Sequence, residues 1–202
     1  MFKRAWNALA GRTEHWSRFR LGLTIAVVAV GATAVGIAIS AAAVVATGTE
    51  SFCGTSCHSM HPVRDEYKGT IHDKNRTGVR AGCADCHIPH DNVVNMLTVK
   101  TVSGIRDIWG QYVTGVIDTK EKFEKERYRL AVMVWTHMKK NDSTECRSCH
   151  DRAGMDPDLQ NDAAKENHAK AKAQGHTCID CHFGIAHNEP DGPGPKELKI
   201  AK

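Results

Sequence analysis

The sequence has few aromatic side chains and no block of basic residues. Only 6% of its 202 residues are Phe, Trp or Tyr, which is thin for the hydrophobic core of a chain of this length. The formal charge of +4 is spread along the chain, so nothing resembles the dense basic patch that binds nucleic acid. We therefore expect no nucleic-acid binding, and an interior filled partly by something other than side chains.

The sequence also lacks a segment in which apolar and polar residues alternate as in a half-buried strand. The expected fold is therefore mainly α, with little or no sheet. Apolar periodicity predicts a helix over residues 118–140, and further helices are expected over residues 92–115 and 162–174, the last with Gly175 as its C-terminal stop. Asp118 and Glu121 have the spacing of a capping box at the start of the helix over residues 118–140.

Cysteine is the residue that the sequence uses in a pattern. Its eight cysteines form four close pairs, and a histidine directly follows the second cysteine of each pair. Disulfides, zinc and covalently attached haem all use such pairs. The four groups are Cys53, Cys57 and His58; Cys83, Cys86 and His87; Cys146, Cys149 and His150; Cys178, Cys181 and His182.

The histidine in every group favours haem over the two alternatives. A disulfide framework does not require it, and a zinc site needs two pairs that converge on one metal. In Cys-x-x-Cys-His, two thioethers hold the edge of the porphyrin while the adjoining imidazole reaches the iron. We expect four covalently bound haem c groups, with His58, His87, His150 and His182 as proximal iron ligands. Three residues separate Cys53 from Cys57, so the geometry of haem 1 is left open.

A long apolar segment precedes the cysteines. Residues 21–45 are nearly all Val, Ala, Ile, Leu and Gly, and as a helix they would extend about 37 Å, enough to cross a bilayer with some tilt. We assign residues 21–46 to a single transmembrane anchor. Gly31 and Gly36 would let two such helices approach closely, as in a homodimer.

The charges around this segment predict its orientation. Five basic residues and one acid precede it, whereas Glu50 is the first charge after it. The positive-inside rule then places residues 1–20 in the cytoplasm and the cysteines in the periplasm, with the anchor in the inner membrane. A cleavable secretory signal is the alternative, although the apolar run is longer than a usual signal core. Both interpretations export the cysteines.

The exported residues 50–188 read as a duplicated two-haem unit, with halves 50–91 and 145–188 joined by a helical connector, 92–140. In each half a haem motif, a free histidine, a second haem motif and another free histidine follow one another. This symmetry predicts that the four free histidines are distal iron ligands. They are His72, His90, His168 and His187. Residues 189–202, rich in Pro, Gly and Lys, are expected to form a flexible tail.

Met60 is a further candidate ligand, in the run from Cys57 to Met60. A thioether is a softer ligand than imidazole and raises the haem potential, which would suit the haem that first accepts electrons. A methionine packed against the porphyrin edge is an equally good interpretation of this residue.

The order of these blocks resembles the NapC/NirT family of membrane-anchored tetrahaem c-type cytochromes, and within it the sequence most resembles NapC. The likeness extends from the anchor to His187. It is carried by the first motif with its Ser-Met, Asn75-Arg-Thr-Gly-Val-Arg80, Cys83-Ala-Asp-Cys-His-Ile-Pro-His90, Gly115-Val-Ile-Asp-Thr119, Glu145-Cys-Arg-Ser-Cys-His150 and Thr177-Cys-Ile-Asp-Cys-His-Phe-Gly-Ile-Ala-His187.

The resemblance implies oxidation of membrane quinol and delivery of electrons to a periplasmic reductase, such as a nitrate reductase, in anaerobic respiration. It also supports the four distal histidines. In the related NrfH branch, the residue that matches Met60 is a ligand of haem 1, and a lysine and an aspartate seven residues apart form the quinol site. Lys100 and Asp107 match that spacing and would lie on one face of a helix.

Two other functions fit the same sequence. Electrons could flow in reverse, from a periplasmic dehydrogenase such as a hydroxylamine-oxidising enzyme to quinone. The chain could also be an anchoring electron-transfer subunit without a quinone site. The terminal acceptor is determined by the partner protein.

Overall fold

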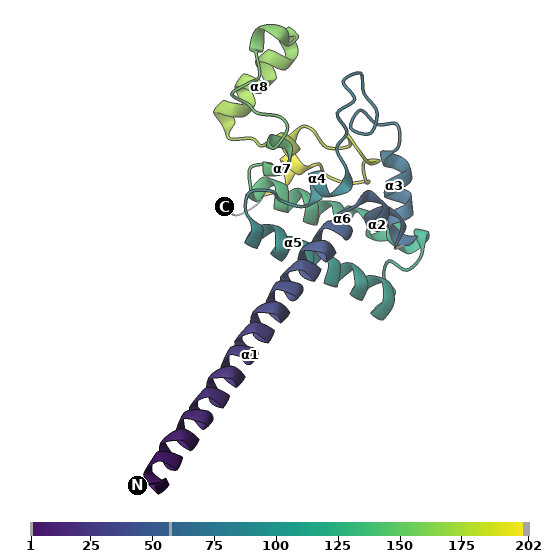
Figure 1. The fold of residues 1–202 in the computed structure, drawn as a ribbon. Helices are drawn as coiled ribbons and strands as arrows, with labels where there is room; N and C mark the ends of the chain where they lie inside the picture. The colour runs from purple at the N-terminus through teal and green to yellow at the C-terminus, as the bar shows by residue number, and fades with distance from the viewer. Residues whose placement is uncertain (1, 57, 200–202) are drawn as a thin grey trace. The chain divides into compact units, whose positions relative to one another are not determined.

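The computed structural model describes the backbone of residues 2–56 and 58–199, and the side chains of residues 17–56 and 59–199. Helices and turns account for all the secondary structure in these ranges, and no strand occurs there, which confirms the mainly α fold. The chain divides into two units, Met1–Thr47 and Gly48–Lys202. The first is a single helix, and the second, the haem unit, contains all the cysteine motifs (Figure 1).

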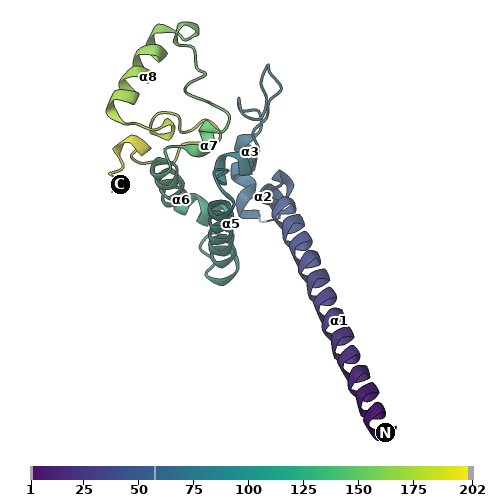
Figure 2. The same ribbon diagram turned by 60° about the vertical axis from the view of Figure 1, so that its left-hand side comes forward.

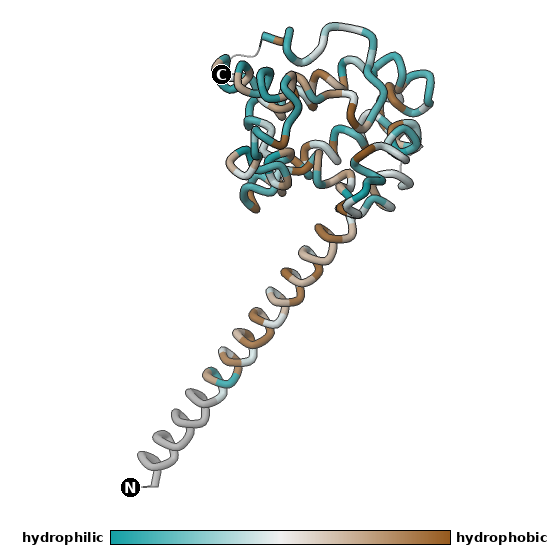
Figure 3. Tube along the Cα trace, turned by 90° about the horizontal axis from the view of Figure 1, so that it is seen from above, coloured by the Kyte–Doolittle hydropathy of each residue, from teal (hydrophilic) through white to brown (hydrophobic). Residues whose placement is uncertain are grey.

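Helix α1 (Phe2–Ala46) contains the predicted membrane anchor. Residues Ser17–Ala46 have a mean hydropathy of 2.3 and are long and apolar enough to cross a membrane. Figure 3 shows this stretch as mostly hydrophobic along its length. The hydroxyls of Thr24, Thr33 and Ser40 each donate to the carbonyl oxygen four residues earlier, at 2.8–2.9 Å. These few polar groups are therefore satisfied within the helix, as a hydrocarbon environment requires.

The haem unit is a series of helices joined by turns (Figures 1 and 2). Residues 93–174 include the three helices predicted from the sequence, which are α5, α6 and α8. The full set is α2 (Glu50–Thr55), α3 (His61–Tyr67), α4 (Cys83–His87), α5 (Val93–Ile108), α6 (Lys120–Lys140), α7 (Thr144–Arg147) and α8 (Asp162–Gln174), with the short helical turns η1 (His58–Met60), η2 (Trp109–Val113), η3 (Pro157–Leu159), η4 (Cys178–Asp180) and η5 (Pro195–Glu197).

The start of α6 differs by one residue from the predicted capping box. Thr119, and not Asp118, is the N-cap, and its hydroxyl accepts a hydrogen bond from the Lys122 amide. Asp118 pairs instead with the Lys122 ammonium at 2.7 Å. Both residues can cap a helix, and the extended backbone of Thr119 decides between them.

The hydrophobic core of the described residues is small. Trp135 and Met138 of α6 pack with Ile179 of η4, and partly buried side chains, among them Tyr128 and Phe183, surround them. A core of this size agrees with the low aromatic content.

The C-terminal segment differs from the flexible tail that the composition predicts. The Lys139 ammonium donates to the carbonyl oxygens of Pro195 and Leu198 at 2.6 and 3.1 Å, and the Tyr128 hydroxyl donates to that of Pro193 at 3.2 Å. Pro195 is buried. A segment with few apolar side chains is thus held through its backbone carbonyls by α6, a contact that composition does not reveal.

Candidate haem sites

Each described cysteine motif lies in a short helical turn. In the third and fourth motifs the amide of the histidine, His150 or His182, donates at 2.9 Å to the carbonyl of the first cysteine of its motif. The turn therefore brings the imidazole close to its own cysteines, as attachment of one porphyrin to all three requires. None of the seven cysteines among the described residues is in a disulfide, so each is available to form a thioether bond with haem. Cys57 lies outside the described residues.

An aspartate inside two of the motifs fixes these turns. The Asp85 carboxylate accepts from the Gly82 amide at the start of α4, and Asp180 accepts from the Thr177 amide at the start of η4, both at 2.7 Å. Each aspartate occupies the position before the second cysteine. The Cys-x-Asp-Cys-His sequence thus supplies its own helix cap.

Three pairs of histidine rings face each other. Their centroids are 6.2 Å apart for His72 and His150, 6.1 Å for His87 and His187, and 6.0 Å for His168 and His182. An imidazole nitrogen lies about 2 Å from a transition metal that it binds, and its ring centre is about 1 Å further away, so two imidazoles on one iron have centroids roughly 6 Å apart. All three pairs fit a haem iron between them.

Each pair joins one histidine of a haem motif to one of the predicted distal ligands. Two pairs cross between the halves of the sequence: His72 faces the third motif, and His187 faces the second. Only His168 faces a motif of its own half. The two sequence repeats are therefore interleaved in space.

Hydrogen bonds fix the ring orientation of two distal histidines. His187 Nδ1 donates to the Val63 carbonyl oxygen at 3.1 Å, and His168 Nδ1 donates to Gln160 Oε1 at 2.7 Å. In each ring the proton on Nδ1 leaves the lone pair on Nε2 available for iron. His87 keeps solvent-accessible surface, but desolvation by nearby protein atoms, with repulsion from His187, lowers its pKa to about 4. The neutral imidazole is the form that binds a metal.

The segment that holds His187 is fixed by an ion pair that the sequence did not reveal. The Arg127 guanidinium binds the Glu66 carboxylate through two hydrogen bonds of 2.6 and 2.9 Å. The same carboxylate accepts from the Asn188 amide, next to His187, at 3.0 Å. Residues from α3, α6 and the last haem segment thus meet at Glu66. They are far apart in the sequence, so only the tertiary structure shows their role.

The loop that carries His72 is fixed in a similar way. The Tyr67 hydroxyl is buried and donates to the His72 carbonyl oxygen at 3.0 Å. Arg80, at the end of the same loop, pairs with Glu50 and Asp73 at 2.5 and 2.7 Å. These contacts give Arg80, the last residue of the family-like block Asn75–Arg80, a structural role.

Haem 1 has fewer described residues than the other three sites. The His58 side chain and Cys57 lie outside the described residues, whereas Met60 is half-buried at the end of η1. His90 Nε2 lies 3.8 Å from an Asp85 carboxylate oxygen, and His90 forms no ring pair with another described histidine. The ring pairs thus use three of the four predicted distal histidines and leave His90, like Met60, without a described iron partner.

Consecutive haem motifs are neighbours in space. Helix α2 packs on α4, and α4 packs on α7. The side chain of Cys53 lies close enough to Cys83 to act on it electrostatically, and Cys149 acts on Cys86 in the same way. Cys146 and Cys178 lie within hydrogen-bond distance of each other. The motifs therefore form a row in the order of the sequence.

Lys100 and Asp107 lie on the side of α5 that faces the first motif. Both side chains are partly buried, and their charges act on the thiol of Cys53 in opposite directions, although burial is the main cause of its raised pKa. Burial also raises the pKa of Asp107, while the Arg106 guanidinium opposes this change. The structure thus brings the predicted lysine and aspartate together beside the first haem motif.

The fold and these sites define a multihaem c-type cytochrome with one membrane helix. The sequence matches the NapC/NirT cytochrome c family, N-terminal region, over residues 15–192. This chain belongs to that family. It carries four covalently attached haem c groups, and its helix α1 indicates a single-pass protein of the inner membrane.

Three relatives illustrate the likeness. NirT, a denitrification system component of Stutzerimonas stutzeri, is 49% identical over 148 residues, 73% of this chain and 72% of its own. A protein of Allochromatium vinosum described as a tetrahaem c-type cytochrome is 46% identical over 147 residues, 73% of this chain and 78% of its own. NapC of Escherichia coli is 46% identical over 144 residues, 71% and 70% of the two chains. No solved structure matches the chain.

Proposed function

We propose that this cytochrome is a quinol dehydrogenase, which oxidises membrane quinol beside haem 1 and passes the electrons to a periplasmic reductase. The observation that carries the proposal is the position of Lys100 and Asp107 on one side of α5, where both act on Cys53 of the first motif. A carboxylate there is close to the haem that would accept electrons. The family membership supports electron transfer.

Oxidation of one quinol releases two electrons and two protons. Haem held by the four motifs would supply the one-electron acceptors. The Asp107 carboxylate accepts a hydroxyl proton of the quinol as general base, and the burial that raises its pKa makes it a stronger base than an exposed aspartate. The Lys100 ammonium donates a hydrogen bond to a quinol oxygen and stabilises the negative charge that develops there. Both protons of the quinol are released to the solvent on the side of the membrane where the haem unit lies.

The same proposal assigns the iron ligands. His72 with His150 would hold haem 3, His187 with His87 would hold haem 2, and His168 with His182 would hold haem 4. Haem 1 takes His58, Met60 and His90 as its candidate ligands. The row of motifs then forms a path from haem 1 to haem 4. The positive-inside rule places the haem unit in the periplasm, where a soluble reductase can collect the electrons.

Rapid mixing of the detergent-solubilised full-length protein with a menaquinol or ubiquinol analogue tests the proposal. Haem absorbance is followed for the wild type, Asp107→Asn and Asp91→Asn. Asp91 is a matched control because it lies just before α5 and is exposed. We expect rapid reduction of the wild type and the control, and a rate at least tenfold lower for Asp107→Asn with unchanged haem content.

Other results would support one of the alternatives. Equal rates for the three proteins would remove Asp107 from the site. A wild type that accepts electrons from a soluble donor, but from no quinol, would be an anchoring electron-transfer subunit. Fast quinone reduction by haems that a periplasmic dehydrogenase has reduced, with slow quinol oxidation, would support the reverse direction.

A further inference from the structure

Helix α5 and the turn η2 that continues it turn their apolar side chains outward. Ile105, Ile108, Trp109 and Tyr112 are 61%, 56%, 58% and 65% exposed. Val94 and Leu97 extend the same exposed stripe towards the start of the helix. The six residues recur at intervals of three, four or eight along the helix and therefore share one side, which we call the α5 outer face.

The opposite side of the same helix faces the protein and carries polar residues beside the partly buried Met96 and Val99. Lys100, Ser103 and Asp107 are partly buried, and Gln111 is only 5% exposed. A helix on the surface of a water-soluble domain has the reverse arrangement, with its apolar side towards the core. Single exposed apolar residues are common, but six of them on one face of a helix, with charged and polar residues partly buried on the other, indicate a non-aqueous neighbour.

We propose that the α5 outer face lies on the lipid bilayer as an interfacial helix. The chain itself brings a bilayer close, because three residues separate the membrane helix, which ends at Ala46, from α2, which begins at Glu50. Three residues extend at most about 11 Å. Lys100 and Asp107 of α5 lie close enough to Cys53 of α2 for their charges to act on its side chain. The haem unit therefore keeps α5 within reach of the membrane surface.

The side chains of this helix have the chemistry of a bilayer interface. Trp109 and Tyr112 combine an apolar ring with a polar group, and such residues concentrate where hydrocarbon meets headgroups. Arg106 is exposed and can pair with a lipid phosphate. The one acid between Val93 and Val113 is Asp107, which lies on the inner side. No carboxylate on the outer face therefore opposes contact with anionic lipid.

This placement gives α5 two roles on its two sides. Lipid lies against the outer face, while the residues proposed to bind quinol lie on the inner side, so that a quinol dissolved in the bilayer needs to pass only the width of one helix. This consequence rests on the proposed function. The contact between the α5 outer face and lipid does not.

Spin labels on the full-length haem protein test the contact. Cysteines are introduced singly at Ile105 and Tyr112, and at Leu159 and Ile71 as controls, because these two are also exposed apolar residues but belong to other segments. The native cysteines are bonded to haem, so the added thiol takes the label. Each protein is placed in nanodiscs of phosphatidylethanolamine and phosphatidylglycerol, and its accessibility to oxygen and to a water-soluble nickel chelate is measured.

We expect the labels at Ile105 and Tyr112 to be more accessible to oxygen than to nickel, and those at Leu159 and Ile71 to show the opposite. Aqueous accessibility at all four positions would overturn the proposal. So would exclusion of both reagents from Ile105 and Tyr112 together with spin–spin broadening, which would mean that a second copy of the chain covers this face. The measurement needs no quinol, so it remains decisive even if the protein proves to have no quinol activity.

Discussion

Asp107 shows how one side chain can have its chemistry set by its position. Burial on the inner side of α5 raises the pKa of its carboxyl group, and the neighbouring Arg106 lowers it. The general base must be ionised before it accepts a proton, so quinol oxidation should fall as the pH is lowered through the raised pKa. The acidic limb of the rate profile should therefore lie above the ordinary range of an aspartate.

Removal of the opposing charge shifts this limb further. In Arg106→Gln the Asp107 carboxylate loses a favourable charge, its pKa rises, and the acidic limb should move to higher pH, while the rate at high pH changes little. Stopped-flow reduction by a quinol analogue between pH 5 and 8 measures the shift. Arg129→Gln, which removes an exposed arginine of α6, is the control. A limb that moves equally in both variants would contradict this assignment.

The histidine pairs predict which haem loses its ligand in each variant. His72→Ala removes the ring that faces His150, so haem 3 should become five-coordinate and bind carbon monoxide, while the other haems are unchanged. The carbon monoxide difference spectrum and the electron paramagnetic resonance of the high-spin iron measure this change. His61→Ala is the control, because the exposed His61 belongs to none of the ring pairs. An unaltered low-spin spectrum in His72→Ala would refute the assignment.

At the scale of the elements, α6 connects segments that the sequence separates. Its Lys139 pairs with the buried Asp180 of η4 at 2.7 Å and also holds the C-terminal segment. Burial alone would raise the pKa of Asp180, but hydrogen bonds from Lys139 and Thr177 outweigh it and lower that pKa. The ion pair therefore joins the last haem motif to the core.

Loss of Lys139 should destabilise this junction. In Lys139→Met the carboxylate of Asp180 stays buried without its cation, and we expect the free energy of unfolding to fall by about 3 kcal/mol. Lys170→Met removes an exposed partner of Glu166 on α8 and should cost less than about 0.5 kcal/mol. Denaturant unfolding followed by circular dichroism compares the two. If the free energy of unfolding falls by a similar small amount in both variants, the ion pair between Lys139 and Asp180 contributes no more to stability than an exposed pair does.

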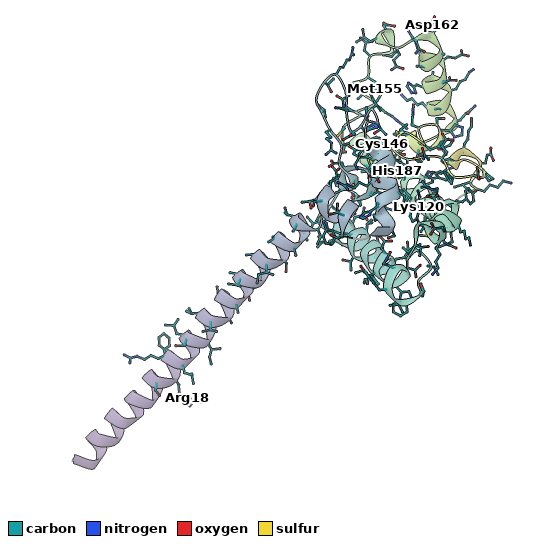
Figure 4. All side chains as sticks on the ribbon, turned by 90° about the vertical axis from the view of Figure 1, so that its right-hand side faces the viewer. Arg18, Lys120, Cys146, Met155, Asp162 and His187 are labelled. Carbon is teal, nitrogen blue, oxygen red and sulfur yellow. The ribbon has the colours of Figure 1, made fainter. Side chains whose placement is uncertain are left out.

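For the whole molecule, the row of motifs and the proposed function together predict the order in which haems are reduced. Helices α5 and α8 lie at opposite ends of the haem unit, as Figures 1 and 2 both show. Cys146 and His187, labelled in Figure 4, belong to segments between these ends. Electrons that enter beside α5 therefore have to pass the second and third motifs before they reach the haem whose ligand His168 lies on α8.

Removal of one haem should interrupt this order. In Cys146→Ala/Cys149→Ala, which cannot attach haem 3, a quinol analogue should rapidly reduce the haems of the first two motifs but not that of the fourth. In Cys178→Ala/Cys181→Ala the three remaining haems should all be reduced rapidly. Stopped-flow absorbance, scaled to the haem content of each variant, measures the reduced fraction. Complete rapid reduction in the first variant would rule out a single row.

The sequence by itself determined the chemical class of this protein. Four Cys-His motifs, one apolar helix and the bounds of α8 follow from spacing and composition, because attachment chemistry, bilayer thickness and helix capping act over a few neighbouring residues. Local patterns also suggested which histidines outside the Cys-His motifs are distal iron ligands. The local patterns did not predict the hydrogen bonds from Lys139 to the C-terminal segment. A composition rich in Pro, Gly and Lys gives no sign of a partner that is distant in the sequence.

Only the tertiary structure decided which haem motif each of the other functional residues lies beside. The sequence repeat suggested two self-contained halves, whereas His72 and His187 each face a motif of the other half. Many exposed Lys/Asp pairs on helices have the seven-residue spacing of Lys100 and Asp107. What distinguishes this pair is its position beside Cys53, which only the tertiary structure shows. Such contacts depend on the path of the whole chain, and no short-range rule of spacing encodes that path.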